Sequence, residues 1–286
     1  MDSKATLGEG PVWDHKQSWL YWVDILGKKI HRYDPITQIN SSVDVEHYVG
    51  AIAIRESGGL ICALDDGFYL VDFESGQKTF INDPEEERKH NRFNDGKCDP
   101  AGRFWAGTME IDAKKPNGAL YCVDVDFQVR KVLDDVTISN GLAWSPDYRS
   151  MYYIDTPTQQ IVAFDYDLER GEISNKKVVI TVPIEDGSPD GMTIDEEGML
   201  WVAYWNGSKV VRWNPQTQQP IDIIHIPAIN VTSCVFGGSN LDELYVTTAR
   251  TGLSEEQLKS HPLSGGVFRV KTEVRGTISA RFKGSR

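Results

Sequence analysis

The stretch that decides the fold is PDGMTIDEEGMLWVAYWNGSKVVRWNP, residues 189–215. Its first apolar run, GMTI, ends in a turn rich in Asp, Glu and Gly, and the large apolar pair Leu200-Trp201 begins a second run. Another turn, NGS at 206–208, leads into a third run, KVVRW. Runs of this length, rich in Val, Ile, Trp and Tyr and bounded by Gly, Asp, Asn and Pro, predict consecutive short β-strands.

The same pattern recurs along the whole chain. The apolar pairs that mark it are Leu20-Tyr21, Leu60-Ile61, Phe104-Trp105, Met151-Tyr152, Leu200-Trp201 and Leu244-Tyr245. Their second members are spaced 40–49 residues apart, which is the repeat length of propeller blades. We therefore predict an all-β fold, a six-bladed β-propeller with four antiparallel strands per blade, as one domain over residues 1–286. A β-sandwich array or a solenoid is the alternative.

Two segments differ from the strand pattern. SEEQLKS at 254–260 is helix-like, with Ser254 as its N-cap and acidic residues in its first turn. The last residues, FKGSR at 282–286, are irregular, and we expect them to be a tail outside the repeat.

Composition and charge exclude several classes of partner. The 286 residues include 42 acidic and 30 basic ones, which gives a formal net charge of −12. Nucleic acids and anionic membranes require clustered Lys and Arg, so neither is an expected partner. No stretch reaches the roughly 18 apolar residues of a membrane span, and the N-terminus lacks the apolar core of a signal peptide. We expect a cytoplasmic protein, a monomer or weak homodimer, whose partner is a small molecule.

Several familiar catalytic and metal motifs are missing from the sequence. The four cysteines form no CxxC pair, so we expect reduced, mostly buried thiols, with a disulfide or zinc site as the minor alternative. The six histidines lack metal-binding spacing and are expected at the surface or in packing roles. There is no GxSxG serine-hydrolase motif and no glycine-rich phosphate loop.

The repeat itself locates a candidate site. In a propeller, the residue just before each innermost strand lies at one mouth of the central channel. We call the second member of each apolar pair its anchor. Counting back 11 or 12 residues from each anchor gives Glu9, Gly50, Asn94, Asn140, Asp190 and Ser233. Convergent oxygen donors are what a hard cation such as Ca²⁺, Mg²⁺ or Mn²⁺ requires. Local turn formation is the alternative explanation for each Asn or Asp, but Glu9, Asn140 and Asp190 in register on three blades favour a cation site.

Two further features should lie near this mouth. Arg92 precedes Asn94 by two residues, so its guanidinium can bind a hydroxyl, a carbonyl or an anion there, or else pair with the preceding acidic run. The segment EIDAKKPNG, 110–118, joins two strands and should overhang the mouth as a loop or lid. Glu110 and Asp112 either reach the site or are solvated.

The residues also resemble a known family. The matching stretches are GEGPVWD (8–14), NRFNDGKCDPAGRFWAGTM (91–109), ISNGLAWSPD (138–147), YYIDT (152–156), PDGMTIDEEGMLWVA (189–203) and VTSCVFGGSNLDELYVT (231–247). Together they resemble the SMP-30, gluconolactonase and luciferin-regenerating enzyme family, which includes regucalcin. The resemblance covers nearly the whole chain and implies a six-bladed β-propeller.

The resemblance also implies roles for the site residues. Glu9, Asn140 and Asp190 would bind one divalent metal ion, with Ca²⁺ as the first choice and Mg²⁺, Mn²⁺ or Zn²⁺ as alternatives, and Asp190 would also accept and donate the proton. Arg92 and Asn94 would bind substrate. The lid position that is Glu in regucalcin-like members is Asp112 here.

The reaction implied is hydrolysis of a sugar-acid lactone, such as a gluconolactone, to the open acid. Asp190 would deprotonate the attacking water and return a proton to the ring oxygen. Hydrolysis of organophosphate esters, or of a heterocyclic nitrile as in luciferin regeneration, is a second enzymatic interpretation. A calcium-responsive binding protein without turnover is the non-enzymatic alternative.

Overall fold

The strands of each sheet follow one another in chain order, from the channel outwards. The innermost strands are β1 (Gly8–Asp14), β5 (Val49–Ile54), β9 (Asn91–Cys98), β13 (Ser139–Trp144), β17 (Ser188–Ile194) and β21 (Asn230–Gly237). The second strands are β2 (Trp19–Asp24), β6 (Leu60–Leu64), β10 (Phe104–Glu110), β14 (Ser150–Asp155), β18 (Leu200–Trp205) and β22 (Glu243–Ala249). The third strands are β3 (Lys29–Asp34), β7 (Gly67–Val71), β11 (Gly118–Val123), β15 (Gln160–Asp167), β19 (Lys209–Asn214) and β23 (Val267–Lys271). The outermost strands are β4 (Ile39–Asp44), β8 (Lys78–Asn82), β12 (Val129–Val136), β16 (Glu172–Thr181) and β20 (Gln219–His225).

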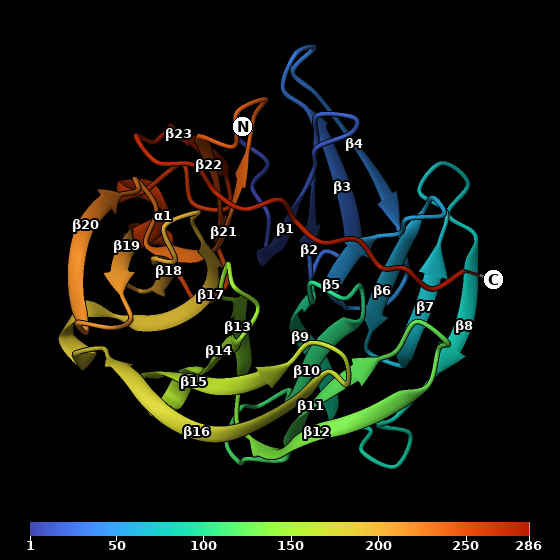
Figure 1. Cartoon of the computed structure of the whole chain (residues 1–286). Helices are drawn as coiled ribbons and strands as arrows, with labels where there is room; N and C mark the ends of the chain where they lie inside the picture. The colour runs from blue at the N-terminus through green and yellow to red at the C-terminus, as the bar shows by residue number, and fades with distance from the viewer. Residues whose placement is uncertain (286) are drawn as a thin grey trace.

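These sheets form a closed ring of six blades. The computed structural model describes residues 1–285, and Figure 1 shows the blades arranged radially around a central axis. Each innermost strand contacts the innermost strand of the next blade, and β21 contacts β1 to complete the circle. The six-bladed β-propeller predicted from the repeat is confirmed.

The sixth blade joins the two ends of the chain. Within residues 1–285 its sheet contains three strands, β21, β22 and β23, whereas the other five sheets contain four. The N-terminal residues lie along β23, where the backbones of Met1 and Val267 exchange hydrogen bonds of 2.7 and 2.9 Å. Thr232 Oγ1 also donates to the carbonyl of Gly8, 2.6 Å away. The first and last blades are therefore hydrogen-bonded to each other.

The hydrophobic core is divided among the blade interfaces. Each of six clusters of buried side chains is built mainly from two neighbouring blades, and Phe282 of the C-terminal segment joins one of them. The predicted anchors Tyr21, Ile61, Trp105, Tyr152, Trp201 and Tyr245 are all buried in these clusters. A single sheet cannot cover both of its faces, so burial against both neighbours is what stabilises each blade.

Buried aspartates fix the turns that precede two of these anchors. Asp99 is fully buried and accepts hydrogen bonds from the Trp105 indole (3.0 Å) and the Arg103 guanidinium (3.1 Å). Asp195 repeats this arrangement two blades later, with the Trp201 indole at 2.9 Å and an arginine ion pair. A buried carboxylate is tolerated only when it is paired and hydrogen-bonded, so these contacts hold the aromatic anchors in register.

The non-strand segments have defined places. The predicted helix is α1 (Glu255–Ser260), and Ser254 caps it in a capping box with Gln257. Two short 3-10 turns, Thr156–Thr158 and Ile184–Asp186, flank β14 and β17. All four cysteines are buried with free thiols.

The C-terminal segment does not form a loose tail. In Figure 1 it crosses from the side of β21 and β22 to the side of β6 and β7. Gly276 donates to the carbonyl of Leu241 at one end, and Phe282 pairs with the backbone of residues 54–56 at the other. Phe282 is fully buried against Phe127. The expected tail is therefore part of the packed structure up to Gly284, and Arg286 lies outside the described residues. We call residues 275–283 the strap.

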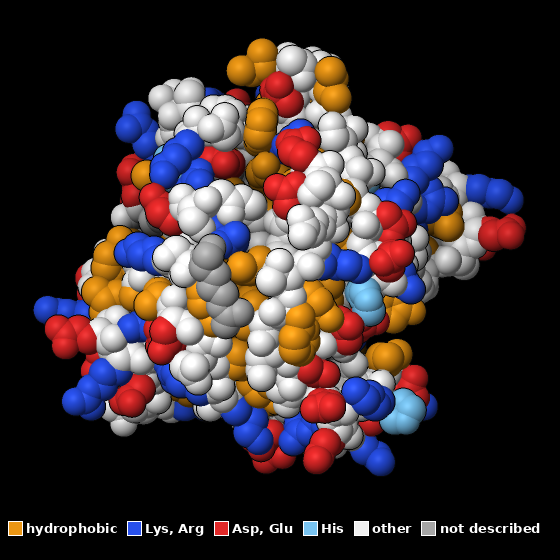
Figure 2. All heavy atoms as spheres, turned by 90° about the vertical axis from the view of Figure 1, so that its right-hand side faces the viewer, with side chains coloured by type: hydrophobic (Ala, Val, Ile, Leu, Met, Phe, Trp, Pro, Cys, Tyr) orange, Lys and Arg blue, Asp and Glu red, His pale blue; other side chains and the backbone are white. Residues whose placement is uncertain are grey.

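The surface carries mixed charge. Figure 2 shows acidic and basic side chains interspersed on the face over β6–β8, to the right in Figure 1. Among residues 1–285, no helix has the length and apolar character needed to span a bilayer.

Candidate active site

A β-bulge places each polar ring residue at the mouth of the channel. In β17, Pro189 pairs with Tyr204 and Met192 with Val202, so Asp190 and Gly191 together oppose a single residue. Equivalent shifts occur at Asn140 in β13 and at Asn94 in β9, and directly after Glu9 in β1. A bulge re-aims the side chain that it contains. The innermost strands can therefore keep apolar faces against their neighbours while these polar groups point into the channel.

Four of the six predicted ring residues line one cavity. Its volume is about 620 Å³, and we call it the upper cavity. The polar lining residues are Glu9, Arg92, Asn94, Asn140, Thr156, Ser188, Asp190 and Thr251, and the apolar ones are Leu7, Leu26, Tyr48, Met109, Ile111, Ile138, Pro157 and Trp205. We call the buried polar residues of this lining the floor of the cavity and the apolar residues its walls. A mixture of this kind is typical of small-molecule sites.

The two remaining ring positions are explained by packing. A Cβ on Gly50 would lie 2.4 Å from the backbone of Phe93, so glycine allows β5 and β9 to approach each other closely. Ser233 is buried beneath Gly191, where a Cβ would lie 2.2 Å from the serine hydroxyl. Gly50 and Ser233 are absent from the lining of the upper cavity.

Three carboxylates are buried together at this point. Glu9 and Asp190 are 3% and 5% exposed and approach closely enough to share a hydrogen bond, and Asp95 is 4% exposed. Burial, together with the charge of Asp95, raises the pKa of Glu9 to about 8. Burial and the charge of Glu9 raise the pKa of Asp190 well above its usual range. Close carboxylates oppose each other's ionisation, so the cluster favours a bound cation.

The orientation of the Asn140 amide supports a cation there. Thr156 Oγ1 donates its single proton to the carbonyl of Pro189 (2.8 Å), so it can only accept from Asn140 Nδ2, which lies 2.8 Å away. This leaves Asn140 Oδ1 buried and without a hydrogen-bond partner among residues 1–285. Buried polar atoms are normally satisfied. The orphaned oxygen and the two neighbouring carboxylates therefore fit an oxygen-ligated divalent ion.

Arg92 and Asn94 form one rigid unit beside this cluster. Arg92 Nη1 donates to Asn94 Oδ1 and to the carbonyl of Phe93, both at 2.9 Å, and Asn94 Nδ2 donates to the carbonyl of Ser139 at 2.8 Å. Burial lowers the pKa of Arg92 to about 10. Arg92 thus lies inside the upper cavity and has no ion pair with the acidic run at 84–87 within residues 1–285.

The loop after β10 contributes a different residue from the one expected. The Asp112 side chain is 69% exposed and pairs with Lys114 at 3.5 Å. Glu110 accepts from Asn117 Nδ2 at 3.1 Å. The loop residue that lines the upper cavity is Ile111. Substrate contact by Asp112 stays a prediction, and this structure places its carboxylate in solvent.

Comparison with known proteins places the chain in a family. The model of the SMP-30/gluconolactonase/LRE-like region matches residues 7–250, which include every residue of the upper cavity except Thr251. The chain belongs to this family. The resemblance inferred from the sequence motifs is thereby confirmed.

Members of the family match over almost the full length. A Bacillus subtilis protein named "Putative sugar lactone lactonase YvrE" is 43% identical over 283 residues, covering 99% of this chain and 97% of that protein. Regucalcin of Xenopus laevis is 41% identical, covering 97% and 95%. A solved regucalcin from Agrobacterium tumefaciens, described as a calcium-binding protein, has a TM-score of 0.95 at 28% identity and covers 99% of this chain and 96% of that one.

The family fold also brings together residues that sequence spacing did not reveal. Asp95 lies beside Asn94 in the bulge of β9, and the motif Asn-Asp-Gly at 94–96 was the available signal, because a glycine inside a strand often marks a bulge. Thr156 orients Asn140 from the turn after β14. Neither residue could be found by counting back from the anchors.

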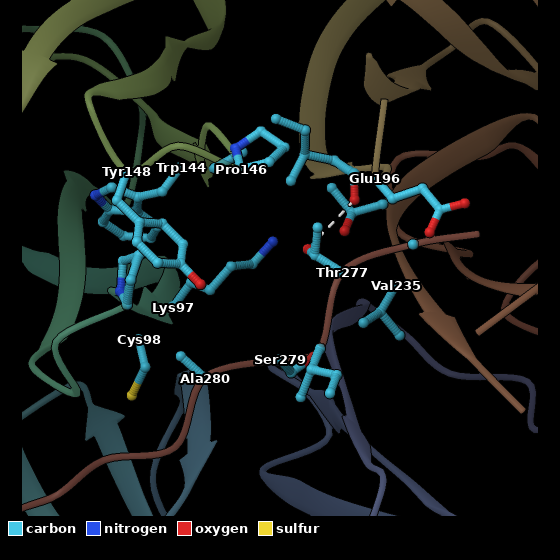
Figure 3. A pocket seen from close by; sticks show the side chains of 16 residues that line it. Lys97, Cys98, Trp144, Pro146, Tyr148, Glu196, Val235, Thr277, Ser279 and Ala280 are labelled. Carbon is cyan, nitrogen blue, oxygen red and sulfur yellow. Dashed lines mark hydrogen bonds between the residues drawn. The ribbon is translucent and has the colours of Figure 1, made fainter. Parts of the chain in front are cut away.

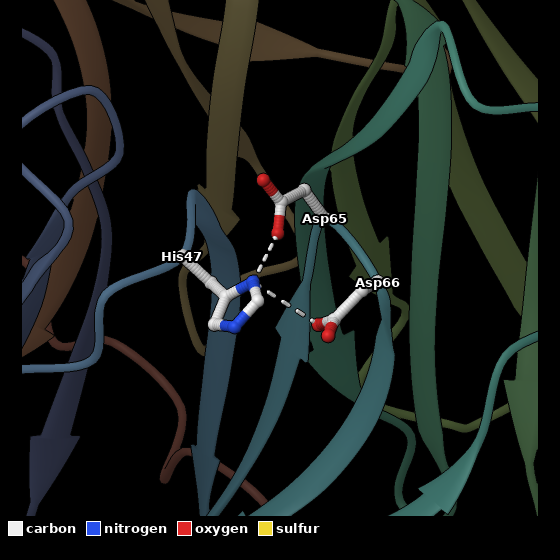
Figure 4. A group of neighbouring side chains, drawn as sticks. All are labelled: His47, Asp65 and Asp66. Atoms are coloured by element: carbon white, nitrogen blue, oxygen red, sulfur yellow. Dashed lines mark hydrogen bonds and ion pairs between the residues drawn. The ribbon is translucent and has the colours of Figure 1, made fainter.

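A second group of possible metal ligands lies on the same face. His47, after β4, approaches Asp65 Oδ1 at 2.8 Å and Asp66 Oδ1 at 3.4 Å in the turn between β6 and β7 (Figure 4). His47 is 18 residues from Asp65, so histidine spacing could not reveal it. These side chains are 29–41% exposed. The buried, all-oxygen set of the upper cavity is the better match for a hard cation.

Proposed function

We propose that this chain hydrolyses lactones of sugar acids in the upper cavity, with Asp190 as general base and acid. The observation that carries the proposal is the convergence of Glu9, Asn140 and Asp190 on the cavity floor, with the orphaned Asn140 oxygen among them. The lactonase names within the family support the same class of reaction.

Among the polar residues on the cavity floor, Arg92 and Asn94 would position the substrate. Asn94 is held by Ser139 and Arg92, so Arg92 presents its remaining N–H groups at a fixed position to a carbonyl or hydroxyl oxygen of the substrate. Such preorganised donors stabilise negative charge as it develops on the lactone oxygen. The apolar walls, with Tyr48 and Trp205 among them, exclude water and strengthen these interactions.

The proton follows a simple path in this proposal. Asp190 takes a proton from a water molecule as the water oxygen bonds to the lactone carbonyl carbon. The bond between that carbon and the ring oxygen then breaks, and Asp190 returns the proton to the leaving ring oxygen. The product is the open hydroxy acid.

Glu9, Asn140 and Asp190 would hold one divalent ion, with Ca²⁺ preferred because every donor is an oxygen; Mg²⁺, Mn²⁺ and Zn²⁺ are the alternatives. When bound, the ion supplies Lewis-acid stabilisation of the developing oxyanion.

The test compares Asp190→Asn with a matched control, Asp165→Asn, whose exposed carboxylate accepts a hydrogen bond from Asn175 on the outside of blade four. Hydrolysis of several aldonolactones is followed with a pH indicator, with and without added divalent ions, and a phosphotriester is included. We expect Asp190→Asn to lose about 10²–10⁴-fold in kcat/KM and Asp165→Asn to keep wild-type values. Wild-type turnover by Asp190→Asn would refute the proposed role, and preference for the phosphotriester would change the substrate class.

A calcium-binding function without turnover is the second candidate. The all-oxygen donor set and the calcium-binding relative favour it. It predicts tight, Ca²⁺-selective binding and no hydrolysis of any lactone in the panel. Weak binding that is equal for Ca²⁺, Mn²⁺ and Zn²⁺ would count against it.

A further inference from the structure

A second cavity lies at the opposite end of the channel. Its volume is about 480 Å³, and its lining comes from the C-terminal ends of β9, β13 and β17, whereas the upper cavity lies at their N-terminal ends. The strap closes one side through residues 276–280. We call this space the lower cavity (Figure 3).

The strap makes this wall a fixed part of the fold. On one side of the cavity, Glu196 N donates to the carbonyl of Arg275 at 2.9 Å. On the other side, Phe282 exchanges backbone hydrogen bonds of 2.9 and 2.8 Å with Ile54 and Glu56. The segment between these anchors is therefore suspended over the channel and held at both ends.

Lys97 is the charged group directed into this space. Figure 3 shows its ammonium pointing into the middle of the cavity. Lys97 Nζ donates to the carbonyl of Met192 at 2.7 Å and has no ion-pair partner among residues 1–285. Burial lowers the pKa of Lys97. Lys97 is half-buried, and the nearby charge of Asp95 opposes part of this lowering. Its ammonium has three protons to donate, of which Met192 takes one, so the others are available to a ligand in the cavity.

The other walls are mostly apolar. Trp144, Pro146 and Tyr148 come from the end of β13 and the turn after it, and Ile278 comes from the strap. The residues Tyr148 and Ile278 are 47% and 57% exposed, so apolar surface at this cavity faces solvent, as it does at many binding sites. An apolar cavity with one convergent charged donor is a typical small-molecule site.

We infer that the lower cavity binds a small organic anion with a single charge and an apolar body, such as a carboxylate on a ring or short hydrocarbon chain. Lys97 receives the carboxylate, while Trp144, Tyr148 and Ile278 cover the apolar part. A single charge is favoured because one ammonium faces the space, Glu196 lies at its edge, and the chain carries a net charge of −12. This site is separate from the upper cavity and does not depend on lactone hydrolysis.

The experiment uses benzoate as the probe, with benzyl alcohol as its neutral counterpart, and isothermal titration calorimetry on the full chain. Benzoate should bind with one-to-one stoichiometry and at least about tenfold more tightly than benzyl alcohol, because only the carboxylate of benzoate forms a charged hydrogen bond with the Lys97 ammonium. Inorganic phosphate, which lacks an apolar body, should bind more weakly than benzoate.

Two pairs of variants locate the binding. Lys97→Met should weaken benzoate binding by about tenfold or more, whereas Lys114→Met makes the same change in net charge on the exposed loop after β10 and should leave it unchanged. Ile278→Asp should abolish binding by repulsion, and Ile278→Asn, which differs only in charge, should retain it. The Ile278 pair keeps the test decisive if Lys97→Met fails to fold.

Three results would overturn the inference. The first is equal affinity for benzoate and benzyl alcohol. The second is unchanged benzoate binding in folded Lys97→Met or, if that variant does not fold, in Ile278→Asp. The third is binding that Arg92→Met removes and Lys97→Met does not, since this would place benzoate in the upper cavity.

Discussion

Thr156 offers a sharp test of how the fold prepares Asn140 for a cation. Its hydroxyl donates to the carbonyl of Pro189 and accepts from Asn140 Nδ2, both at 2.8 Å. Thr156→Val keeps the shape of the side chain but removes both contacts. Asn140 Nδ2 then lacks a buried partner, which should cost about 1–3 kcal/mol in the free energy of unfolding. The amide also loses the contact that fixes its orientation.

The expected effect on metal binding follows from this geometry. Groups that orient a ligand typically change metal affinity by about 10–100-fold when they are lost. Calorimetric titration with Ca²⁺ and with Mn²⁺ should show this weakening in Thr156→Val. At saturating metal, kcat for a lactone should stay close to the wild-type value, because Thr156 acts through Asn140.

Two further variants make this result interpretable. Thr156→Ser keeps the hydroxyl and should restore most of the affinity. Thr158→Val removes an exposed hydroxyl two residues away that donates only to the carbonyl of Asp155, and it should have no effect on metal binding. Wild-type metal affinity in Thr156→Val, or an equal loss in Thr158→Val, would refute the reasoning.

The remaining predictions concern the strap, a buried histidine and the cavity wall. Phe282→Ala removes a fully buried ring and should lower the free energy of unfolding in urea by about 3–5 kcal/mol. Ile278→Ala in the exposed middle of the strap should change it by less than about 0.5 kcal/mol. Equal effects of the two variants would contradict the role of Phe282 in holding the strap. Burial lowers the pKa of His31 to about 4 from 6.5, so its folded form favours the neutral ring. Wild-type stability should therefore fall more than that of His31→Gln as the pH drops from about 6.5 to 4, and parallel pH profiles of unfolding would exclude this. Ile111→Asn replaces an apolar wall residue with one that forms hydrogen bonds. It should raise kcat/KM for gluconolactone relative to that for an alkyl lactone by about tenfold. An unchanged ratio would show that Ile111 does not face the substrate.

The sequence predicted the fold and much of the candidate site for a physical reason. Each blade must bury one large apolar anchor, such as Trp105 or Trp201, against a neighbouring blade. The spacing between successive anchors in the sequence therefore equals the length of a blade. Paired strands keep a fixed register, and counting back from the anchors therefore located Glu9, Asn140 and Asp190 correctly at one mouth. The regular spacing of the strands was therefore sufficient to place these three residues at the mouth.

What the sequence could not provide depends on departures from that periodicity. Strict alternation would turn Asp95 away from the side on which Asn94 lies, but the bulge of β9 brings both residues to the channel. In the loop after β10, the backbone presents Ile111 to the cavity and Asp112 to solvent, and no strand pattern specifies that choice. The packing of Phe282 was also hidden, since its partners are far away in sequence.

The charges along the channel connect the bulges of the innermost strands to the proposed function. Glu9, Asp95 and Asp190 are three buried carboxylates, whereas the cations nearest to them are Arg92 at the upper end and Lys97 at the lower end. The chain's own groups thus leave the channel with an excess of one negative charge when all five are ionised. Burying such an imbalance opposes folding, and the raised pKa values of Glu9 and Asp190 reflect that cost. Under the proposed function, a cation held by Glu9, Asn140 and Asp190 would balance this excess charge, which is the reason that the bulges of β1, β9, β13 and β17 matter for the site.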